Sequence, residues 1–332
     1  MISLEAYRQN FLTLARDFFD ELLSEDKALF RDTLFLSFLG ARICYASSRP
    51  LNLFAEERFR QKEEFLAFLS RLKRSGHASV FAHSPLVVNT SFPEEKAARL
   101  AQVLYKAWCS PKDNALCLNL RHFAEVYDDE TFMAIVEASY EASQKWQNFK
   151  FFHVKFPEGK ATLCAKGALS ELLEKGLPEP QGIKAEPEVF VIDVAPKETA
   201  PFGWLAVVVE GFSRLFSHQY VRHTWLNFNQ RSHRYTQVDQ FVFPPSFDEE
   251  ANNLYESQIE KGLELYQGLV SRGIKKEDAR FVTPQGSATT VLATGPYFVW
   301  EDFVEKRIHP KAQWEIRRLA EALALVFREL NP

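Results

Sequence analysis

One stretch of the sequence, RHTWLNFNQRSHRY at residues 222–235, lies in the densest group of cationic residues in the chain. From residue 214 to residue 235 the chain carries four arginines and three histidines, interleaved with aromatic residues. Guanidinium groups bind phosphate bidentately and stay charged at any working pH, and aromatic rings offer stacking surfaces for a base or a flavin. The stretch therefore indicates a site for nucleotide or dinucleotide phosphate. On composition alone, a solvated cationic face, or arginines paired with Glu210 and Asp239, would explain it equally well.

The overall composition favours a folded protein. The 332 residues are 46% hydrophobic and 14% aromatic, enough for a large core or two domains. A formal charge of −4 does not favour long nucleic acid or an acidic membrane as a partner. The longest apolar run, residues 204–209, is too short to cross a bilayer, and the N-terminus has the pattern of an amphipathic helix, so we expect a cytoplasmic location without membrane contact.

Cysteine and histidine usage indicates neither disulfides nor a metal site. Four cysteines without a C-x-x-C pair predict reduced thiols in the core: Cys44, Cys109, Cys117 and Cys164. His77 and His83 flank a turn, but their spacing matches no common set of metal ligands, so we predict no metal. Ser232 beside His233 does not indicate a hydrolase, because the chain has no G-x-S-x-G elbow.

Apolar spacing predicts a mostly helical first half followed by a mixed second half. Helices are expected over residues 5–23, 56–72, 94–108 and 130–146, and again over 252–272 and 312–330. Short β-rich runs at 189–194 and 205–209 predict strands, the segment after them is expected to be helical up to His223, and 239–247 to be a loop or edge strand. Residues 174–188 concentrate Pro, Gly and charge, so we place a domain boundary there, dividing the chain into 1–187 and 188–332. The expected class is α+β, a small antiparallel sheet packed with long helices.

The stretch at 222–235 resembles the signature Arg-His-Arg-x-x-Ser-x-Asn-Glu-x-Ser-x-Arg-Tyr of flavin-dependent thymidylate synthases. Three further segments match that family in its own order. Residues 76–83 resemble Gly-His-x-Ser-x-Phe-Glu-His, residues 279–284 resemble Ala-Arg-x-x-Leu-Pro, and residues 307–317 resemble Leu-Arg-x-x-x-x-Ala-Gln-Trp-Glu-Ile. Because four matches occur in order, the chain is identified as a divergent member of the family.

The resemblance implies a fold like that of the family and a reductive methylation. In it, dUMP becomes dTMP, methylenetetrahydrofolate gives the carbon, and FAD reduced by NADPH gives the hydride. Positioning and electrostatic stabilisation of this kind suit an arginine-rich site. By matched position, the resemblance assigns to the nucleotide Gln219, Gln230, Ser232, Arg234, Tyr235, Arg280 and Arg307. Arg307, against the uracil carbonyl, and Ser232 are the expected catalytic residues, and FAD is assigned Ser79, His83, Arg222, His223 and Asn229.

Several positions depart from the family pattern. The second Arg of the signature is Thr224, its first Ser is Asn227 and its Glu is Gln230, so a cation and a carboxylate are absent. A charge-assisted hydrogen bond contributes roughly 1.5–3 kcal/mol, so each loss could weaken ligand binding by one to two orders of magnitude. The family's Asn-x-Arg segment is Gly295-Pro296-Tyr297 here, and Asp302 and Ala82 replace a flavin-side Asn and a Glu.

About a hundred residues separate the Gly-His segment from the signature, far more than the family requires. Part of this excess, from Asn119 to Val126, resembles the family's C-terminal Asn-x-Arg-x-x-x-Phe segment, which suggests an internal duplication with Tyr127 at the position of Arg307. Since family members are homotetramers with sites between subunits, a tandem pair would predict a homodimer that imitates the tetramer. A single domain with a long insertion is the alternative.

Three functions remain open from the sequence. The first is an active synthase, and the second is a family member that binds nucleotide or flavin without turnover. The third is an arginine cluster that serves RNA or a protein partner, which a steep salt dependence of binding would reveal.

Overall fold

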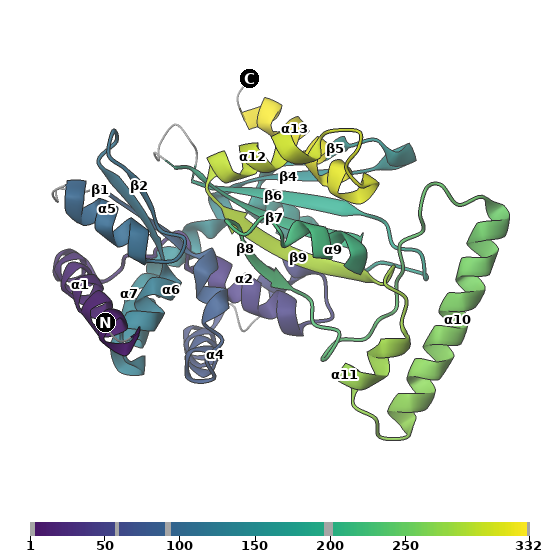
Figure 1. Cartoon of the computed structure of the whole chain (residues 1–332), viewed down its shortest axis with the longest axis horizontal. Coiled ribbons are helices and arrows are strands. Elements are labelled where there is room, and N and C mark those ends of the chain that lie inside the picture. The colour runs from purple at the N-terminus through teal and green to yellow at the C-terminus, as the bar shows by residue number, and fades with distance from the viewer. Residues whose placement is uncertain (1–3, 57–59, 90–93, 196–201, 331–332) are drawn as a thin grey trace.

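The computed structural model describes residues 4–56, 60–89, 94–195 and 202–330, and it contains two antiparallel sheets (Figure 1). The larger sheet has the strand order β5-β4-β6-β7-β9-β8 and the smaller one the order β1-β3-β2. The strands are β1 Pro85–Asn89, β2 Trp108–Ser110, β3 Ala115–Asn119, β4 Lys150–Lys155, β5 Thr162–Ala168, β6 Glu188–Ala195, β7 Trp204–Ser213, β8 Asn227–Gln230 and β9 Ala288–Gly295.

Helices of the N-terminal part cover one face of the larger sheet. They are α1 Leu4–Glu25, α2 Leu34–Tyr45, α4 Lys62–Arg74, α5 Glu94–Val103, α6 Leu120–Val126, α7 Asp129–Ser143 and α8 Leu169–Lys175, with 3-10 turns η1 Pro50–Ala55, η2 Ala78–His83, η3 Gln144–Asn148 and η4 Pro157–Gly159. Side chains of α1, α2, α4 and α7 share one hydrophobic core with alternate residues of the sheet such as Phe190, Ile192 and Val208. This alternation is the period of two that a strand imposes.

The opposite face of the sheet packs against α9 Arg214–Tyr220, α12 Tyr297–Arg307 and α13 Trp314–Leu330. Here the intervening residues, among them Val191, Val207 and Ala293, meet Trp300 and Leu323 in a second core. The sheet is therefore buried on both faces between two layers of helices, and the mixed α+β class is confirmed.

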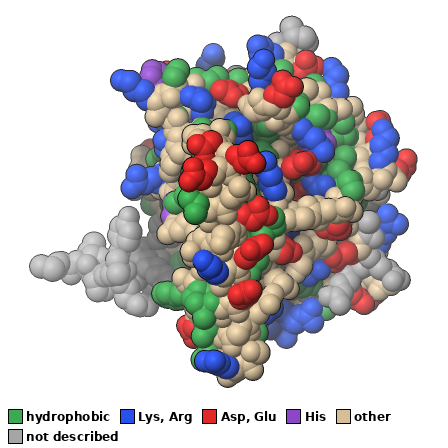
Figure 2. Space-filling view, turned by 90° about the vertical axis from the view of Figure 1, so that its right-hand side faces the viewer, with side chains coloured by type: hydrophobic (Ala, Val, Ile, Leu, Met, Phe, Trp, Pro, Cys, Tyr) green, Lys and Arg blue, Asp and Glu red, His purple; other side chains and the backbone are tan. Residues whose placement is uncertain are grey.

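A long helix, α10 Glu249–Ser271, stands at one edge of the molecule, followed by α11 Lys276–Ala279 and η5 Arg280–Val282 (Figure 1). On the face that carries α10, acidic and basic side chains are interspersed with hydrophobic ones, so this face presents no continuous basic surface (Figure 2). Among the described residues, no helix combines the length and apolar character that crossing a membrane requires.

The expectation of a mostly helical first half is wrong in part, because five strands, β1 to β5, lie before residue 187. The helix expected over 94–108 ends at Val103, and Trp108 begins β2. The cysteines are unpaired, but Cys164 is exposed on β5 and only Cys117 is fully buried, which corrects the expectation of four core thiols. Residues 57–59 of the helix expected over 56–72 lie outside the described residues, and α4 occupies 62–74.

The connection between the two expected segments is irregular, as its Pro and Gly content predicts, but the larger sheet extends across it. Strand β4 pairs with β6 along its whole length, with Lys155 opposite Glu188. Strands of both segments, 1–187 and 188–332, therefore lie in the larger sheet, and side chains of both contribute to a common core.

A glycine marks the place where this connection passes over the sheet. Gly211 has φ +69°, and a Cβ on it would lie 2.2 Å from the carbonyl oxygen of Glu186. The pairing of β7 with β9 is irregular between Val209 and Phe212. Only glycine combines a positive φ with so close a backbone approach, and it lets Glu186 and Pro187 lie directly against β7.

Candidate functional site

Helix α9 and strand β8 carry most of the predicted site residues, and a buried carboxylate fixes the start of α9. The Ser213 hydroxyl caps the helix by accepting from the Phe216 amide (3.0 Å). The Ser213 amide and hydroxyl in turn donate to Glu315 at 2.8 and 2.6 Å, and the Gln313 amide donates to the same carboxylate at 3.1 Å. The Ala-Gln-Trp-Glu segment at 312–315 thus orients the helix that ends in the Arg-His pair.

At the other end of α9, Arg307 and His223 form a direct contact. Arg307 Nε donates to His223 Nε2 at 2.8 Å, and the His223 ring packs edge-on against Phe303. Burial, with a further contribution from the Arg307 charge, lowers the pKa of His223 to about 4. The imidazole is therefore neutral near pH 7 and accepts this bond, which holds the Arg307 guanidinium while leaving its other N–H groups free to donate.

Behind β8, two residues predicted to bind FAD bind each other. His83 is fully buried, with Nε2 2.7 Å from Asn229 Oδ1 and Nδ1 2.9 Å from the Thr294 hydroxyl. Asn229 also donates to Cys44 Sγ at 3.0 Å, and burial lowers the pKa of His83 to about 4. Their polar atoms are satisfied inside the protein, so they form the wall behind the signature.

Two guanidinium groups, those of Arg214 and Arg280, lie close together at the start of α9. Arg214 and Arg280 are both half-buried, and neither forms an ion pair with a described Asp or Glu. Arg280 Nε donates to the backbone carbonyl of Glu277 (3.1 Å), and burial together with the Arg280 charge lowers the pKa of Arg214. Burial and the neighbouring Arg214 lower the pKa of His233 to about 4. Two unneutralised cations side by side are an arrangement that an anion stabilises.

The rest of the signature borders this cation pair. Arg234 is exposed and pairs with Glu277 (2.8 Å), and the Ser232 hydroxyl accepts from the Arg234 amide. Tyr235 is 54% exposed, with its ring 5.2 Å from that of Tyr45.

The predicted residues therefore fall into separate groups. Arg214, Ser232, Arg234 and Arg280 lie near the start of α9, while Arg222, His223 and Arg307 lie beyond its end, across a seven-residue helix roughly 10 Å long. Among the described residues, Arg307 makes no hydrogen bond or ion pair with any member of the first group. Gln219 is half-buried on α9 itself, and Gln230 donates its side-chain amide to Thr289 at 3.0 Å.

Two predicted flavin residues are open to solvent. Ser79 on η2 is exposed, and so is Arg222, whose side chain has no hydrogen bond or ion pair with another described residue.

The sequence assigned no role to Arg214, Cys44 or Thr294. Arg214 could have been found, because it begins the cation-rich stretch. Cys44 and Thr294 carry no such signal, because they reach the site only through the packing of α2 and β9 on β8.

The positions that depart from the family pattern have defined places in the fold. Pro296 is the N-cap of α12, where a missing backbone donor costs little. Asp302 pairs with Lys306 one turn along that helix (2.7 Å). The carbonyl of Ala82 accepts from the Asn227 side chain at 2.9 Å, and the carbonyl of Thr224 accepts from the Tyr105 hydroxyl at 3.5 Å.

Comparison with known proteins finds similarity to the same family over the C-terminal part. The family model described as "Thymidylate synthase complementing protein" matches residues 199–332. The flavin-dependent thymidylate synthase of Sulfurisphaera tokodaii is 34% identical over 128 residues, which are 37% of this chain and 50% of that protein. The one from Geobacter sulfurreducens is 36% identical over 138 residues, covering 37% of this chain and 60% of the relative.

One solved structure has a weak likeness, that of the UMP/dUMP methylase PolB from Streptomyces cacaoi bound with 5-Br dUMP. It is 22% identical, with a TM-score of 0.37, over 40% of this chain and 71% of that one. Of the curated synthases named above, by contrast, the chain spans about half the length. From residue 199 onward, the part that carries the signature and the Arg307 segment, the chain is similar to the flavin-dependent thymidylate synthases.

Proposed function

We propose that this protein methylates dUMP to dTMP. Methylenetetrahydrofolate supplies the one-carbon unit to the uracil ring, a hydride from reduced FAD brings it to the methyl level, and NADPH reduces the flavin again. The observation that carries the proposal is the half-buried pair Arg214 and Arg280, which has no carboxylate partner among the described residues. Such a pair suits a phosphate, which guanidinium groups bind bidentately.

In this proposal the nucleotide phosphate lies against Arg214 and Arg280, with the Ser232 hydroxyl and Gln219 beside it. Arg234 pairs with Glu277 in the free protein and exchanges that partner for the anion, because both its side chain and Glu277 reach solvent. His233, whose pKa burial lowers to about 4, is neutral and adds no charge to this group. These residues bind and orient the nucleotide.

The residues assigned to the flavin fit it in part. Arg222 and Ser79 are exposed and free to hold its phosphates and ring edge, and His223 lies next to Arg222. His83 and Asn229 are occupied with each other, so they shape the wall behind the flavin instead of donating to it. When bound, the flavin supplies the hydride, and the protein supplies position and charge.

Arg307 is assigned to the uracil carbonyl, where a guanidinium would stabilise negative charge that develops on the ring. Within one chain it lies at the far end of α9 from Arg280. We therefore propose that Arg307 serves a site completed by a second copy of the chain, in a homodimer.

The strand order supports an internal duplication, and with it this dimer. The order β1-β3-β2, with α5 between β1 and β2, repeats as β7-β9-β8, with α9 between β7 and β8. Both β3 and β9 are followed by two helices, and Tyr127 directly follows α6 where Arg307 ends α12. The loops after α5 and α9 meet, because the Tyr105 hydroxyl donates to the Thr224 carbonyl at 3.5 Å, and the rings of Trp108 at the start of β2 and Trp225 are 5.1 Å apart. One chain would then supply two related units, of which the second carries the signature.

The test is an assay of dTMP formation from dUMP with methylenetetrahydrofolate, FAD and NADPH, together with the visible absorption of bound flavin. The wild-type protein should turn over, and Arg307→Ala should lose turnover while retaining the nucleotide. Arg272→Ala, which removes an equally charged but remote and exposed side chain, is the matched control and should remain active. Nucleotide binding without product in the wild-type protein would refute the synthase and leave a binding function.

A further inference from the structure

Lys106 lies in the turn between α5 and β2 and contacts the loop of the signature. Its backbone has φ +60°, a conformation that residues other than glycine rarely adopt, and its Nζ donates to the carbonyl of Leu226. The preceding residue, Tyr105, donates to the carbonyl of Thr224 at 3.5 Å. Two consecutive residues of the N-terminal part therefore bind the loop between α9 and β8.

The ammonium of Lys106 also lies near η2, the second segment that the family resemblance assigns to the flavin. Burial lowers the pKa of His83 at the end of η2 to about 4, and the positive charge of Lys106 contributes to this shift. Asn227, which follows Leu226, donates to the carbonyl of Ala82 at 2.9 Å and so joins η2 to β8. Lys106 is therefore placed where the signature loop and η2 meet.

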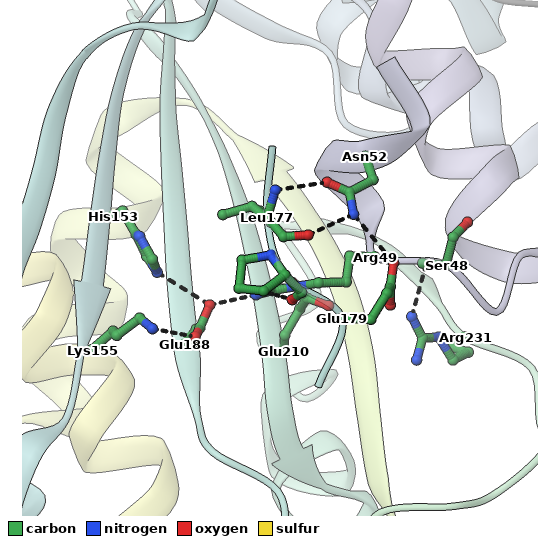
Figure 3. A network of polar contacts seen from close by, with 11 residues as sticks. Ser48, Arg49, Asn52, His153, Lys155, Leu177, Glu179, Glu188, Glu210 and Arg231 are labelled. Carbon is green, nitrogen blue, oxygen red and sulfur yellow. Dashed lines mark hydrogen bonds and ion pairs between the residues drawn. The ribbon is translucent and has the colours of Figure 1, made fainter. Parts of the chain in front are cut away.

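This ammonium has no carboxylate partner. Among the described residues, no Asp or Glu forms an ion pair with Lys106, and the Leu226 carbonyl takes only one of its three N–H donors. By contrast, Arg49, a buried cation beside the larger sheet, pairs with both Glu188 and Glu210 (Figure 3).

The surroundings of Lys106 leave its charge uncompensated. Burial and the nearby charge of Arg121 lower the pKa of Lys106 to about 8, so most of the side chain is still protonated at pH 7. Arg121 itself pairs with Glu125 at 2.6 Å. An anion beside the Lys106 ammonium would stabilise its charged form.

We propose that Lys106 binds the diphosphate of FAD, in place of the cation that the signature lacks at Thr224. This inference rests on the proposed function, because it takes FAD as the cofactor. In oxidised FAD the diphosphate is the anionic part, and an ammonium binds phosphate as a point charge. Arg222, exposed two residues before Thr224, supplies a second positive charge.

The repeated strand order accounts for the position of Lys106. When β1-β3-β2 is compared with β7-β9-β8, the turn after α5 corresponds to the loop after α9. Equivalent loops of the two units therefore meet, and the loop of the first unit supplies the cation that the loop of the second lacks.

Titration of the full chain with oxidised FAD, followed by flavin fluorescence, tests the proposal. Lys106→Gln replaces the charge by a neutral donor and should bind FAD about tenfold more weakly at low salt, and added salt should narrow the gap to the wild type. Lys106→Arg keeps the charge and should bind FAD nearly as tightly as the wild type. Lys112→Gln, at an exposed lysine in the turn between β2 and β3, is the matched control and should bind like the wild type.

Three results would overturn the role of Lys106 alone. They are wild-type affinity for FAD in Lys106→Gln, a loss of equal size at low and high salt, and a loss in Lys106→Arg as large as that in Lys106→Gln; the last two would indicate that Lys106 only holds the loop. A wild-type protein that binds no FAD is a distinct result, since it would refute the flavin-dependent reaction together with this inference.

Discussion

Replacing Arg49 by methionine should strongly destabilise the protein. The side chain is 5% exposed and is the shared partner of Glu188 and Glu210, which stand opposite each other on β6 and β7. It also donates to the carbonyl of Pro178 at 2.9 Å, so its loss frees the connection to the sheet as well. Breaking a buried ion pair by removing one partner costs about 3–5 kcal/mol, because the remaining charge is left uncompensated.

Urea unfolding followed by circular dichroism measures this cost. Arg60→Met, at an exposed arginine, is the control and should change the free energy of unfolding by less than about 0.5 kcal/mol. Adding Glu210→Gln to Arg49→Met should recover part of the loss, because it removes the carboxylate left unpaired. A loss below about 1 kcal/mol for Arg49→Met, or no recovery in the double variant, would refute the view that Arg49 neutralises these carboxylates.

Three further predictions concern stability. Burial alone would raise the pKa of Glu188, but its bonds from His153, Lys155 and Arg49 lower this pKa from 4.5 to about 2. The free energy of unfolding should therefore fall as the pH drops from 4.5 toward 2, and it should fall less steeply in Glu188→Gln. Gly211→Ala should lower the melting temperature because of its positive φ and close backbone contact, whereas Gly268→Ala, with open space around it on α10, should leave that temperature unchanged or raise it. His83→Leu leaves Asn229 and Thr294 without their partner and should cost about 1–3 kcal/mol in urea unfolding; an unchanged midpoint would contradict that contact.

The long amphipathic helices could be predicted from sequence, because their apolar residues repeat at helical spacing. Helix α13 shows this best, with Ile316, Leu319, Leu323 and Val326 buried along one side. Helix α2 was missed because nine of its twelve residues are buried, so it has no polar face and no clear period. The short strand β3 is buried at all five positions, so it shows no alternation of apolar and polar residues and was not predicted either.

The site could be predicted as a set of residues but not as an arrangement. The signature and the Arg307 segment lie in the same fold, and the sequence placed His223 and Arg307 in one site without indicating that they touch, since 84 positions separate them. His83 and Asn229 were expected to face a ligand, whereas they face each other because α2 brings Cys44 against β8. Which polar side chains pair with each other depends on which of them are buried together, and no local sequence pattern encodes that. The nucleotide and flavin roles of these residues stay predictions.

The most direct test of the central claim compares dUMP with deoxyuridine, which differs from it only by the phosphate. If Arg214 and Arg280 bind that phosphate, calorimetry at low salt should give dUMP an affinity at least about tenfold higher, and the double variant Arg214→Gln, Arg280→Gln should lose most of the difference. Equal affinities for the two ligands, or a preference for dUMP that persists in the double variant, would contradict a nucleotide site at the start of α9.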